Sequence, residues 1–324
     1  MPSTDPASRP MRTVRFHRYG PPEEVLVLET AGVPEPEPGQ VRVAVHACGL
    51  NPADWALCNG LFAGDLPRGI GLEVSGIVDR IGDGVADVAV GDLVVGPAPY
   101  LGASAGASDL AVLDHWTRVP AGLDPVRAAA LPMAVETAYR GLDELGVSGG
   151  QTVLIHGAGS TVGFAAVQFA LLRGARVIVT AGATRADELR ALGAEVTSYG
   201  DGMVDRVASL AGGSVDFVLD AGPVSGALPN LVEIAGDADH VLTLSDFEAA
   251  AELGVRVSYG SDTTLRYDVL PEAAQLAAEG RFTIPIARTF ALTDWPEAVC
   301  VSQSGRAGGK LVLLVSDQAL ATQN

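Results

Sequence analysis

Short stretches in which apolar and polar residues alternate fill the first third of the chain, and this spacing predicts strands rather than helices. The runs "VRFHRYG", "QVRVAVHACGL", "EVSGIVDRIG" and "GDLVVG" are rich in β-branched residues and are separated by Gly, Pro and Asp. The prolines of "VPEPEPGQ" cannot donate to a strand ladder, so this stretch is predicted to be a loop. Residues 11–130 are therefore expected to form a compact β-barrel.

The pattern changes near Pro125, where apolar strands begin to alternate with runs of helical spacing. The strands "TVLIH", "RVIVTA", "VDFVLDA" and "HVLTLS" are separated by helices such as "VGFAAVQFALLR". This alternation predicts a doubly wound parallel sheet over residues 131–264. Residues 265–324 are too short to stand alone, and we expect them to complete the first domain.

Two segments of small or polar residues are predicted to lie outside the regular elements. The start, "MPSTDPASRP", is polar and rich in Pro, so residues 1–10 are expected to form a flexible tail and not a signal peptide. The segment Pro99–Asp109 is rich in Gly, Ala and Ser, and it is either a plain connection or a lid.

Net charge and cysteine content indicate which partners and which cellular compartment are expected for this protein. The 324 residues carry 21 Lys and Arg against 39 Asp and Glu, a net charge of −18, which argues against nucleic-acid and anionic membrane partners. The three cysteines form no C-x-x-C pair, and no apolar run reaches membrane-spanning length. We therefore expect a cytoplasmic protein that acts on a small molecule.

A glycine-rich turn follows the strand "TVLIH" and immediately precedes a helix. Such a helix start offers free N–H groups to a pyrophosphate, although the same turn can simply connect a strand to a helix. The spacing is G-x-G-x-x-x-G, one residue longer than the usual dinucleotide motif, so we place Ala158 and Ser160 where the first two glycines normally stand. The predicted phosphate-binding residues are Ala158, Gly159, Ser160, Thr161, Val162 and Gly163.

The end of the next strand bears on which dinucleotide binds. An NAD site usually has an acidic residue here to accept from the ribose hydroxyl, but "TAGATR" has none before Asp187. Thr180, Gly182 and Arg185 offer donors and space for a 2′-phosphate, which favours NADPH. Arg185 could instead be a solvated cation at the start of a helix.

Five motifs spaced along the chain support a family resemblance: "ACGLNPADW", "GLEVSGIVDRIGDGV", "VGDLVV", "LPMAVETAYRGLDELGVSGGQTVLIHGAG" and "GGKLVLLV". With them the chain resembles the zinc-independent quinone oxidoreductase branch of the medium-chain dehydrogenase/reductase superfamily. The resemblance implies an α/β fold, in which a Rossmann domain for NAD(P) is inserted into a GroES-like β-barrel catalytic domain. It also implies a homodimer formed through the edge of the Rossmann sheet, for which "VLTLS" is the candidate strand.

The same resemblance predicts that no zinc is bound. In the zinc-dependent relatives a Cys, a His and a second Cys hold the catalytic metal. Here the corresponding positions are Asn51, Leu72 and Met133. Leucine has no donor atom and methionine is a poor zinc ligand, so alcohol oxidation assisted by a metal is not expected.

Without a metal, the expected reaction is hydride transfer from NADPH to a quinone or an α,β-unsaturated carbonyl, because the developing charge delocalises onto oxygen. The resemblance places Asn51 near the nicotinamide and substrate, and Thr137 near the nicotinamide ring. Tyr139 is a candidate proton donor, and packing within a helix is the competing interpretation. The remaining cofactor residues that the resemblance implies are Tyr199 beside the 2′-phosphate, Leu244 and Ser245 on the loop passing the nicotinamide, and Lys310.

Several assignments stay open from sequence alone. Trp55, Phe62 and Tyr100 either line an apolar substrate pocket or serve as core and surface cover. His156 ends the first Rossmann strand and is expected to shape the glycine turn. Two other functions also remain possible: an NADPH-binding sensor or scaffold, and a tailoring enzyme such as a cyclase that performs no net redox step.

Overall fold

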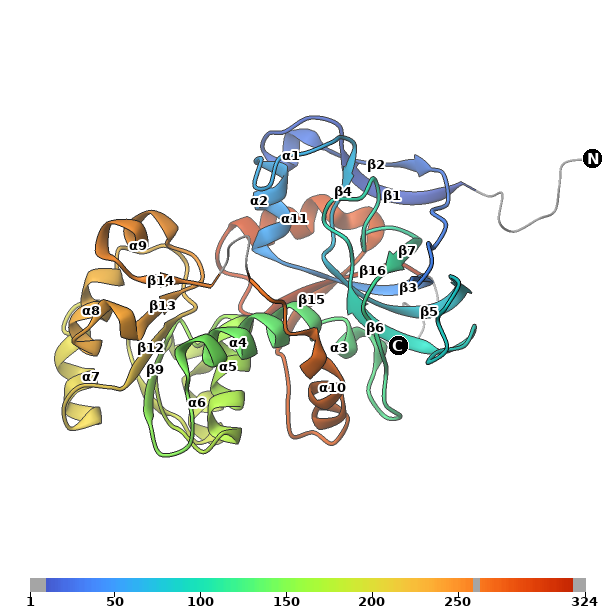
Figure 1. Cartoon of the computed structure of the whole chain (residues 1–324). Coiled ribbons are helices and arrows are strands. Elements are labelled where there is room, and N and C mark those ends of the chain that lie inside the picture. Colours follow the sequence, from blue (N-terminus) through green and yellow to red (C-terminus); the bar gives the residue numbers. More distant parts are fainter. Residues whose placement is uncertain (1–9, 259–262, 317–324) are drawn as a thin grey trace, which may run out of the picture. The chain divides into compact units, whose positions relative to one another are not determined.

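The computed structural model describes residues 10–258 and 263–316, and its internal contacts divide the chain into two compact units (Figure 1). Unit 1 comprises residues 1–133, 270–281 and 285–324, and unit 2 comprises 134–269 and 282–284. The tail predicted over residues 1–10 lies outside the described residues except for Pro10.

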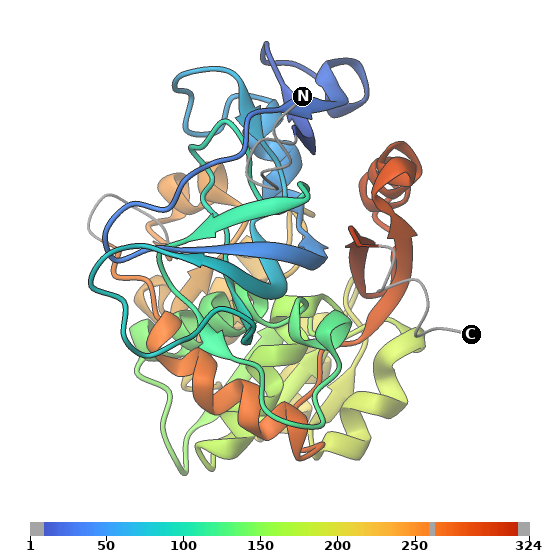
Figure 2. The ribbon, with the colours of Figure 1, turned by 90° about the vertical axis from the view of Figure 1, so that its right-hand side faces the viewer.

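Unit 1 is built from two sheets. Three strands pair in the order β2-β1-β4, and a larger sheet has the order β15-β16-β3-β5-β6-β8, with β7 paired to β3. The central strands β3 and β5 are antiparallel and lie side by side in Figure 2. The strands of this unit are β1 Met11–Phe16, β2 Leu26–Ala31, β3 Val41–Leu50, β4 Arg68–Gly69, β5 Glu73–Ile81, β6 Leu93–Pro97, β7 Leu110–Leu113, β8 Thr117–Arg118, β15 Ile286–Ala291 and β16 Lys310–Leu314.

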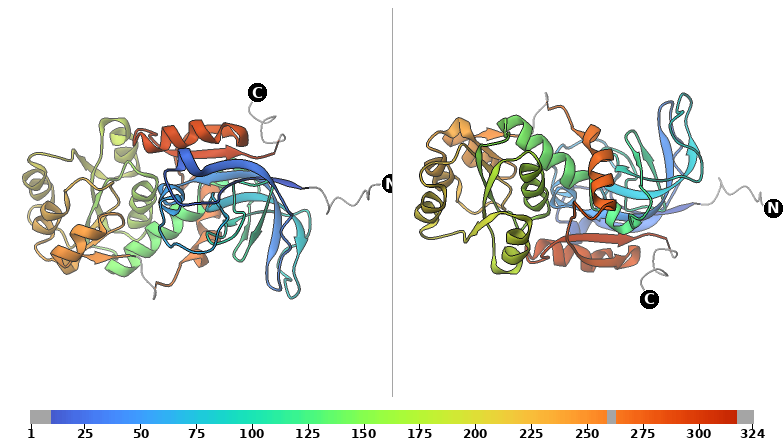
Figure 3. Two further views of the ribbon diagram at one scale, coloured as in Figure 1. Left: turned by 90° about the horizontal axis from the view of Figure 1, so that it is seen from above. Right: turned by 90° about the horizontal axis from the view of Figure 1, so that it is seen from below.

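Helices of unit 1 pack against its strands. The C-terminal helix α11 packs along β15 and β16, as Figure 3 shows, so the last part of the chain joins the sheet that the first part begins. The pairing of β16 with β3 is antiparallel and places Leu311 opposite Leu50. The helices are α1 Pro22–Val25, α2 Pro52–Cys58, α3 Pro125–Ala128, α10 Leu270–Ala278 and α11 Trp295–Gln303, with a 3₁₀ turn at Leu292–Asp294.

The segment Pro99–Asp109 is packed against the barrel. The N–H of Val14 donates to the carbonyl of Ala107, and the N–H of Gly106 donates to that of Gly71. Ala105 and Ala107 are buried, and a Cβ at Gly69 would lie 2.4 Å from the nitrogen of Ala105. Of the two interpretations of this segment, these contacts match a packed connection.

Unit 2 contains one parallel sheet with the strand order β11-β10-β9-β12-β13-β14. This order, counted along the chain, is 3-2-1-4-5-6, the doubly wound arrangement of dinucleotide-binding domains. The strands are largely apolar because helices cover both faces of the sheet. They are β9 Thr152–His156, β10 Arg176–Thr180, β11 Glu195–Thr197, β12 Phe217–Asp220, β13 Val241–Thr243 and β14 Arg256–Val257. The predicted α/β fold class is confirmed.

The helices of unit 2 cover both faces of the sheet. α4, α5 and α6 lie on one face, whereas α7, α8 and α9 lie on the other (Figure 1). The helices are α4 Pro132–Leu145, α5 Thr161–Leu172, α6 Ala183–Leu192, α7 Met203–Ala211, α8 Leu228–Ala235 and α9 Phe247–Leu253, with 3₁₀ turns at Ala238–His240 and Tyr267–Val269. α5 has buried residues all round, including Phe164, Val167 and Phe169, so it is the central helix of its layer.

The edge of the sheet differs from the sequence prediction. The family resemblance makes "VLTLS" the candidate edge strand, but β13 pairs with both β12 and β14. Within the described residues, the short strand β14 ends the order instead. The sequence does not reveal β14, because a strand of two residues is too short to show an apolar periodicity. The homodimer stays a prediction.

No helix among residues 10–258 and 263–316 has both the length and the apolar character needed for a bilayer crossing.

Candidate functional site

The glycine turn of unit 2 connects β9 to α5 at the carboxyl edge of the parallel sheet. Gly157 has φ +73°, and a Cβ there would lie 2.4 Å from Cα of Gly222, so only glycine fits. Gly163 is equally constrained, since its Cβ would lie 2.5 Å from the carbonyl oxygen of Gly157. Gly159 has free space beside it: a Cβ added there would have Arg185 Cγ, at 3.8 Å, as its nearest neighbour.

These positions correct the register predicted from the sequence. The sequence places Ala158 at the tight first position, but the left-handed residue is Gly157 and Ala158 is buried behind it, its N–H donating to the carbonyl of Thr180 at 3.1 Å. The same register places the Ser160 side chain where the pyrophosphate of a bound dinucleotide would approach the backbone. Its hydroxyl instead donates to the carbonyl of Ala221 at 3.0 Å and accepts from the N–H of Gly163 at 3.0 Å.

Ser160 thus acts as the N-cap of α5. Its carbonyl accepts from Phe164, and its hydroxyl satisfies one of the first N–H groups of the helix. No hydrogen bond within the described part of the chain takes the N–H groups of Thr161 and Val162. Those two donors, the positive end of the helix dipole and the open face of Gly159 form a region suited to an anion.

The end of β10 brings four predicted cofactor residues together. A Cβ at Gly182 would lie 3.6 Å from the hydroxyl oxygen of Tyr199, and Arg185 is the residue nearest to Gly159. Tyr199 is 60% exposed. The Arg185 guanidinium lies 2.7 Å from the carboxylate of Glu188 on the same helix, so its charge is shared with that residue. Thr180 is buried and accepts from the N–H of Gly157 at 3.3 Å.

The loop after β13 is tied to the loop after β12. The Ser245 hydroxyl donates to the carbonyl of Gly222 at 2.7 Å, and the N–H of Leu244 donates to the carbonyl of Asp220 at 3.0 Å. Leu244 and Ser245 are half-buried. This loop therefore lies at the same sheet edge as the glycine turn.

The two predicted residues of α4 do not act from one place. Thr137 and Tyr139 are two positions apart, so they point to different sides of the helix. The Thr137 hydroxyl donates to Glu136 at 3.2 Å. The Tyr139 ring packs edge-on against Phe169 with the guanidinium of Arg173 4.5 Å from its centre, contacts that match the packing interpretation and not a proton donor.

A charged cluster lies inside unit 1, where Asn51 precedes α2 and Glu73 begins β5. Lys310, at the start of β16, contacts Glu73 Oε1 through its ammonium and donates to Asn51 Oδ1 at 2.6 Å. Asn51 Nδ2 donates to Glu73 Oε1 at 2.9 Å. Lys310 is 2% exposed and Glu73 0%, so these charges can neutralise only each other.

This cluster fixes the orientation of the Asn51 amide. An ammonium can only donate and a carboxylate only accepts, so the amide oxygen faces Lys310 and the nitrogen faces Glu73. The nitrogen has a second hydrogen, for which the described residues supply no acceptor. The sequence identified Lys310 as a basic position close to the cofactor, and the structure shows that its ammonium is bound to Asn51 and Glu73.

Asn51 is one of the three positions that correspond to zinc ligands in the metal-dependent relatives. Of the other two, Leu72 offers no donor atom, and the N–H of Met133 donates to Glu73 Oε2 at 2.8 Å. Among residues 10–258 and 263–316, no three His, Cys, Asp or Glu side chains converge as metal ligands. Nearby, burial raises the pKa of Asp54 to about 7, although the N–H groups of Asn51 and Gly71 donate to its carboxylate.

The three predicted pocket aromatics separate into two groups. Trp55 is 6% exposed in the core of unit 1 and donates to Ser302 at 2.7 Å. Phe62 and Tyr100 are 40% and 39% exposed, and their rings meet edge-on at 6.1 Å. Arg68, which the sequence analysis missed, is fully buried and donates to the carbonyls of both Phe62 and Tyr100. It ties these two segments together, and a lone arginine in the two-residue strand β4 carries no sequence signal of this.

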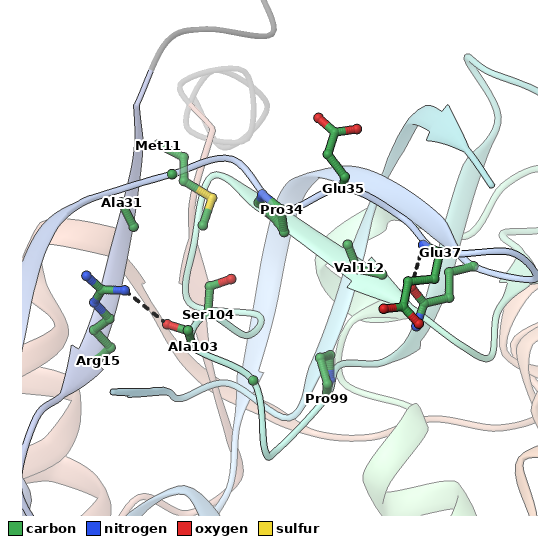
Figure 4. A pocket seen from close by; sticks show the side chains of 13 residues that line it. Met11, Arg15, Ala31, Pro34, Glu35, Glu37, Pro99, Ala103, Ser104 and Val112 are labelled. Carbon is green, nitrogen blue, oxygen red and sulfur yellow. Dashed lines mark hydrogen bonds between the residues drawn. The ribbon is translucent and has the colours of Figure 1, made fainter. Parts of the chain in front are cut away.

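A separate pocket on unit 1 lies between β1, β2 and the segment after β6 (Figure 4). Figure 4 shows the side chain of Arg15 directed toward the carbonyl of Ala103, with an N···O distance of 3.4 Å. None of the predicted site residues lines it.

Two family models match the chain: the alcohol dehydrogenase GroES-like domain over residues 37–117 and the zinc-binding dehydrogenase over residues 192–313. Human quinone oxidoreductase is 35% identical over 177 residues, which is 53% of each chain. A phenolphthiocerol synthesis polyketide synthase of Mycobacterium bovis is 40% identical over 208 residues, 61% of this chain and 10% of the synthase. The chain thus spans about half or less of the length of these relatives.

Among solved structures, the quinone oxidoreductase from Coxiella burnetii superposes with a TM-score of 0.81 at 29% identity, covering 95% of this chain and 100% of that one. A structure described as an NAD-dependent alcohol dehydrogenase matches with the same TM-score at 28% identity over 94% of this chain. The barrel, the doubly wound sheet and these matches agree with one another. The chain belongs to the quinone oxidoreductase-like branch of the medium-chain dehydrogenase/reductase superfamily.

Proposed function

We propose that this protein is a reductase that transfers hydride from NADPH to a quinone or an α,β-unsaturated carbonyl without zinc. The observation that carries the proposal is the open turn at Gly159, with the free N–H groups of Thr161 and Val162, at the carboxyl edge of a doubly wound sheet. Quinone oxidoreductases among the relatives support the reaction class.

The residues at the turn fit a dinucleotide. Gly159 leaves space for close backbone approach, and the Ser160 side chain is turned into the protein by its bond to Ala221. The N–H groups of Thr161 and Val162 would bind the pyrophosphate, and Gly182, Arg185 and Tyr199 would surround the adenosine ribose. When bound, the reduced nicotinamide supplies the hydride.

In unit 1, Asn51 is the proposed group that meets the substrate. Lys310 and Glu73 hold its amide so that one N–H remains for an acceptor. Negative charge develops on the carbonyl oxygen when hydride adds to the electron-poor carbon of a quinone or enone, and a preoriented N–H stabilises that charge. A proton from water then completes the reduction.

The proposed reaction is tested by following a deuterium label from the cofactor into the product. The purified protein is incubated with NADPH deuterated at C4 and a panel of quinones and enones, and the products are examined by mass spectrometry. Deuterium on the reduced carbon is expected, together with less than one tenth equivalent of zinc by elemental analysis. A saturated cofactor complex that reduces no member of the panel would overturn the proposal and favour a sensor or scaffold, whereas a rearranged product without deuterium would favour a cyclase.

The preference for NADPH is tested at Arg185. Replacing Arg185 with Ala is expected to weaken NADPH binding about tenfold, since a charge-assisted hydrogen bond to phosphate is lost, and to leave NADH binding unchanged. Arg190→Ala is the matched control, because Arg190 is paired with Asp187 on the same helix and is 55% exposed. Equal loss of both cofactors in the Arg185 variant would contradict a 2′-phosphate role.

A further inference from the structure

Four polar side chains end four neighbouring strands of the unit 2 sheet, and all are buried. His156 ends β9, Thr180 ends β10, Asp220 ends β12 and Thr243 ends β13. Strand pairing sets them in one row, with His156 opposite both Thr180 and Asp220, and Asp220 opposite Thr243. Their exposed fractions are 6%, 0%, 5% and 0%, so each must find its hydrogen-bond partners inside the protein.

One half of the row fixes the tautomer of His156. Thr180 Oγ1 lies 2.7 Å from His156 Nδ1 and accepts from the N–H of Gly157 at 3.3 Å. The buried hydroxyl also has one proton to donate, and among the described residues His156 Nδ1 is the acceptor within reach. With the Thr180 hydroxyl as the donor, Nδ1 is unprotonated and the neutral ring carries its hydrogen on Nε2.

The other half of the row holds two further loops. Asp220 Oδ2 accepts from the Thr243 hydroxyl at 2.8 Å, and Oδ1 accepts from the N–H of Gly222 at 3.1 Å. Thr243 Oγ1 in turn accepts from the N–H groups of Ser245 at 3.3 Å and Asp246 at 3.2 Å. The row thus bonds to the backbone of the loops that follow β9, β12 and β13.

His156 and Asp220 meet at Gly222. A Cβ on Gly222 would lie 3.4 Å from both His156 Nε2 and Asp220 Oδ1, so both side chains lie close against this glycine. Burial lowers the pKa of His156 and raises that of Asp220, and Asp246 is a further acidic group that faces Asp220. The imidazole is uncharged at neutral pH for this reason.

We propose that the row of His156, Thr180, Asp220 and Thr243 is a positioning network that sets the three loops around the nicotinamide cofactor, with His156 required in its neutral, Nε2-protonated form. The inference rests on the proposed cofactor function. The network acts on these loops through its hydrogen bonds from the N–H groups of Gly157, Gly222 and Ser245. Protonation of His156 places a second hydrogen on Nδ1, reverses the bond to Thr180 and frees that hydroxyl from its acceptor.

The first test needs no cofactor. The long-range ¹H–¹⁵N spectrum of the full chain at pH 7.5, assigned with a His156→Asn variant, is expected to show His156 with its proton on Nε2. A signal from the Nδ1-protonated ring or from the imidazolium would overturn the assignment.

The second test measures cofactor dissociation constants by fluorescence titration with NADPH and NADH. His156→Leu leaves the Thr180 hydroxyl without an acceptor, and about tenfold weaker binding of both cofactors is expected. His156→Asn places an amide oxygen where Nδ1 stood and is expected to stay within about threefold of the wild type. His240→Asn, at the exposed second histidine of unit 2, is the control and should not change binding.

The pH profile separates positioning from a purely structural role. Binding of NADH by the wild type is expected to weaken as the pH falls through the folded-state pKa of His156, which burial places below the ordinary 6.5, while the Asn variant shows no such step. NADH is used because the 2′-phosphate of NADPH titrates in the same range.

The outcomes are distinguishable. If the wild type binds neither cofactor, the proposed function fails. If the wild type binds and the folded Leu variant binds equally well, the function stands and the network proposal fails. If the Leu variant does not fold, the Asn variant and the wild-type spectrum decide.

Discussion

A buried cluster in unit 1 and a buried row in unit 2 satisfy their polar groups in different ways. Unit 1 encloses an ammonium, a carboxylate and an amide that bond directly to one another at Lys310, Glu73 and Asn51. Unit 2 encloses a row of two hydroxyls, one imidazole and one carboxylate that bond to loop backbone as much as to each other. The first arrangement depends on charge neutralisation, the second on hydrogen-bond satisfaction.

The physical difference lies in what remains when one member is removed. A buried charge that loses its partner keeps the full desolvation penalty, whereas a hydroxyl that loses one bond leaves a smaller deficit. We therefore expect that removing one member of the unit 1 cluster lowers the free energy of unfolding more than removing one member of the unit 2 row. Four measurements test this, in order of decreasing expected effect.

Replacing Lys310 with Met is expected to have the largest effect. Glu73 would be left buried without its cation, and the free energy of unfolding should fall by about 3–5 kcal/mol in urea titrations. The double variant Lys310→Met, Glu73→Gln removes both charges and should recover most of that loss. A single variant that loses less than about 1 kcal/mol would show that charge neutralisation between Lys310 and Glu73 contributes little to the stability of unit 1.

The glycine turn offers a matched pair of substitutions. Gly157→Ala forces a left-handed residue against Gly222, and the backbone conformation alone should cost about 1–3 kcal/mol. Gly159→Ala meets nothing closer than 3.8 Å, so unfolding should stay within about 0.5 kcal/mol of wild type while cofactor binding weakens. The same stability loss in both variants would refute the assignment of the tight position to Gly157.

Thr243→Val tests the unit 2 row. The isosteric change removes the donor to Asp220 and the acceptor for Ser245 and Asp246, and we expect a loss of about 1–2 kcal/mol in the same titrations. The exposed Thr293→Val in unit 1 is the control and should be near neutral. A loss as large as that of the Lys310 variant would erase the distinction between the two units.

The smallest expected effect is a pH dependence. Burial lowers the folded-state pKa of His156 below its ordinary 6.5, so between those two values the unfolded chain binds more protons. The stability from a neutral His156 is thus complete above pH 6.5 and is lost as pH falls through the folded-state pKa. Burial raises the pKa of Asp220, which acts in the opposite sense at lower pH.

The comparison of wild type with His156→Asn isolates this contribution. Between pH 7.5 and 5.5 the wild type should lose up to about 1 kcal/mol more than the variant, which has no imidazole to titrate. Parallel stability curves for the two proteins would show that His156 does not titrate in this window.

The sequence predicted the elements more reliably than the contacts among their side chains. Apolar runs that alternate with stretches of helical spacing identified β9, β10, β12 and β13 and the helices between them. The strand and helix periodicities are local properties of the chain, so the sequence shows them directly. The short strand β14 was missed, and the glycine register was shifted by one residue, since the sign of φ at Gly157 depends on its packing against Gly222.

Among the site residues, the sequence identified Asn51 and Lys310 as separate candidates. It could not show that these two bond together with Glu73, since the three lie on strands and a helix start up to 259 positions apart. From sequence, Thr137 is a candidate beside the nicotinamide ring and Tyr139 a candidate proton donor, but the helix directs the two side chains to different sides.

The sequence by itself determined the alternation of strands and helices in unit 2, the absence of thiol and imidazole groups at the three metal positions, and the glycine turn, because each depends on residue type and local spacing. Tertiary structure alone decided which glycine is tight, which partners neutralise Lys310, and which side chains His156 meets at the end of β9. Those properties depend on atoms that only folding brings within about 3 Å, where sterics, desolvation and hydrogen bonding act.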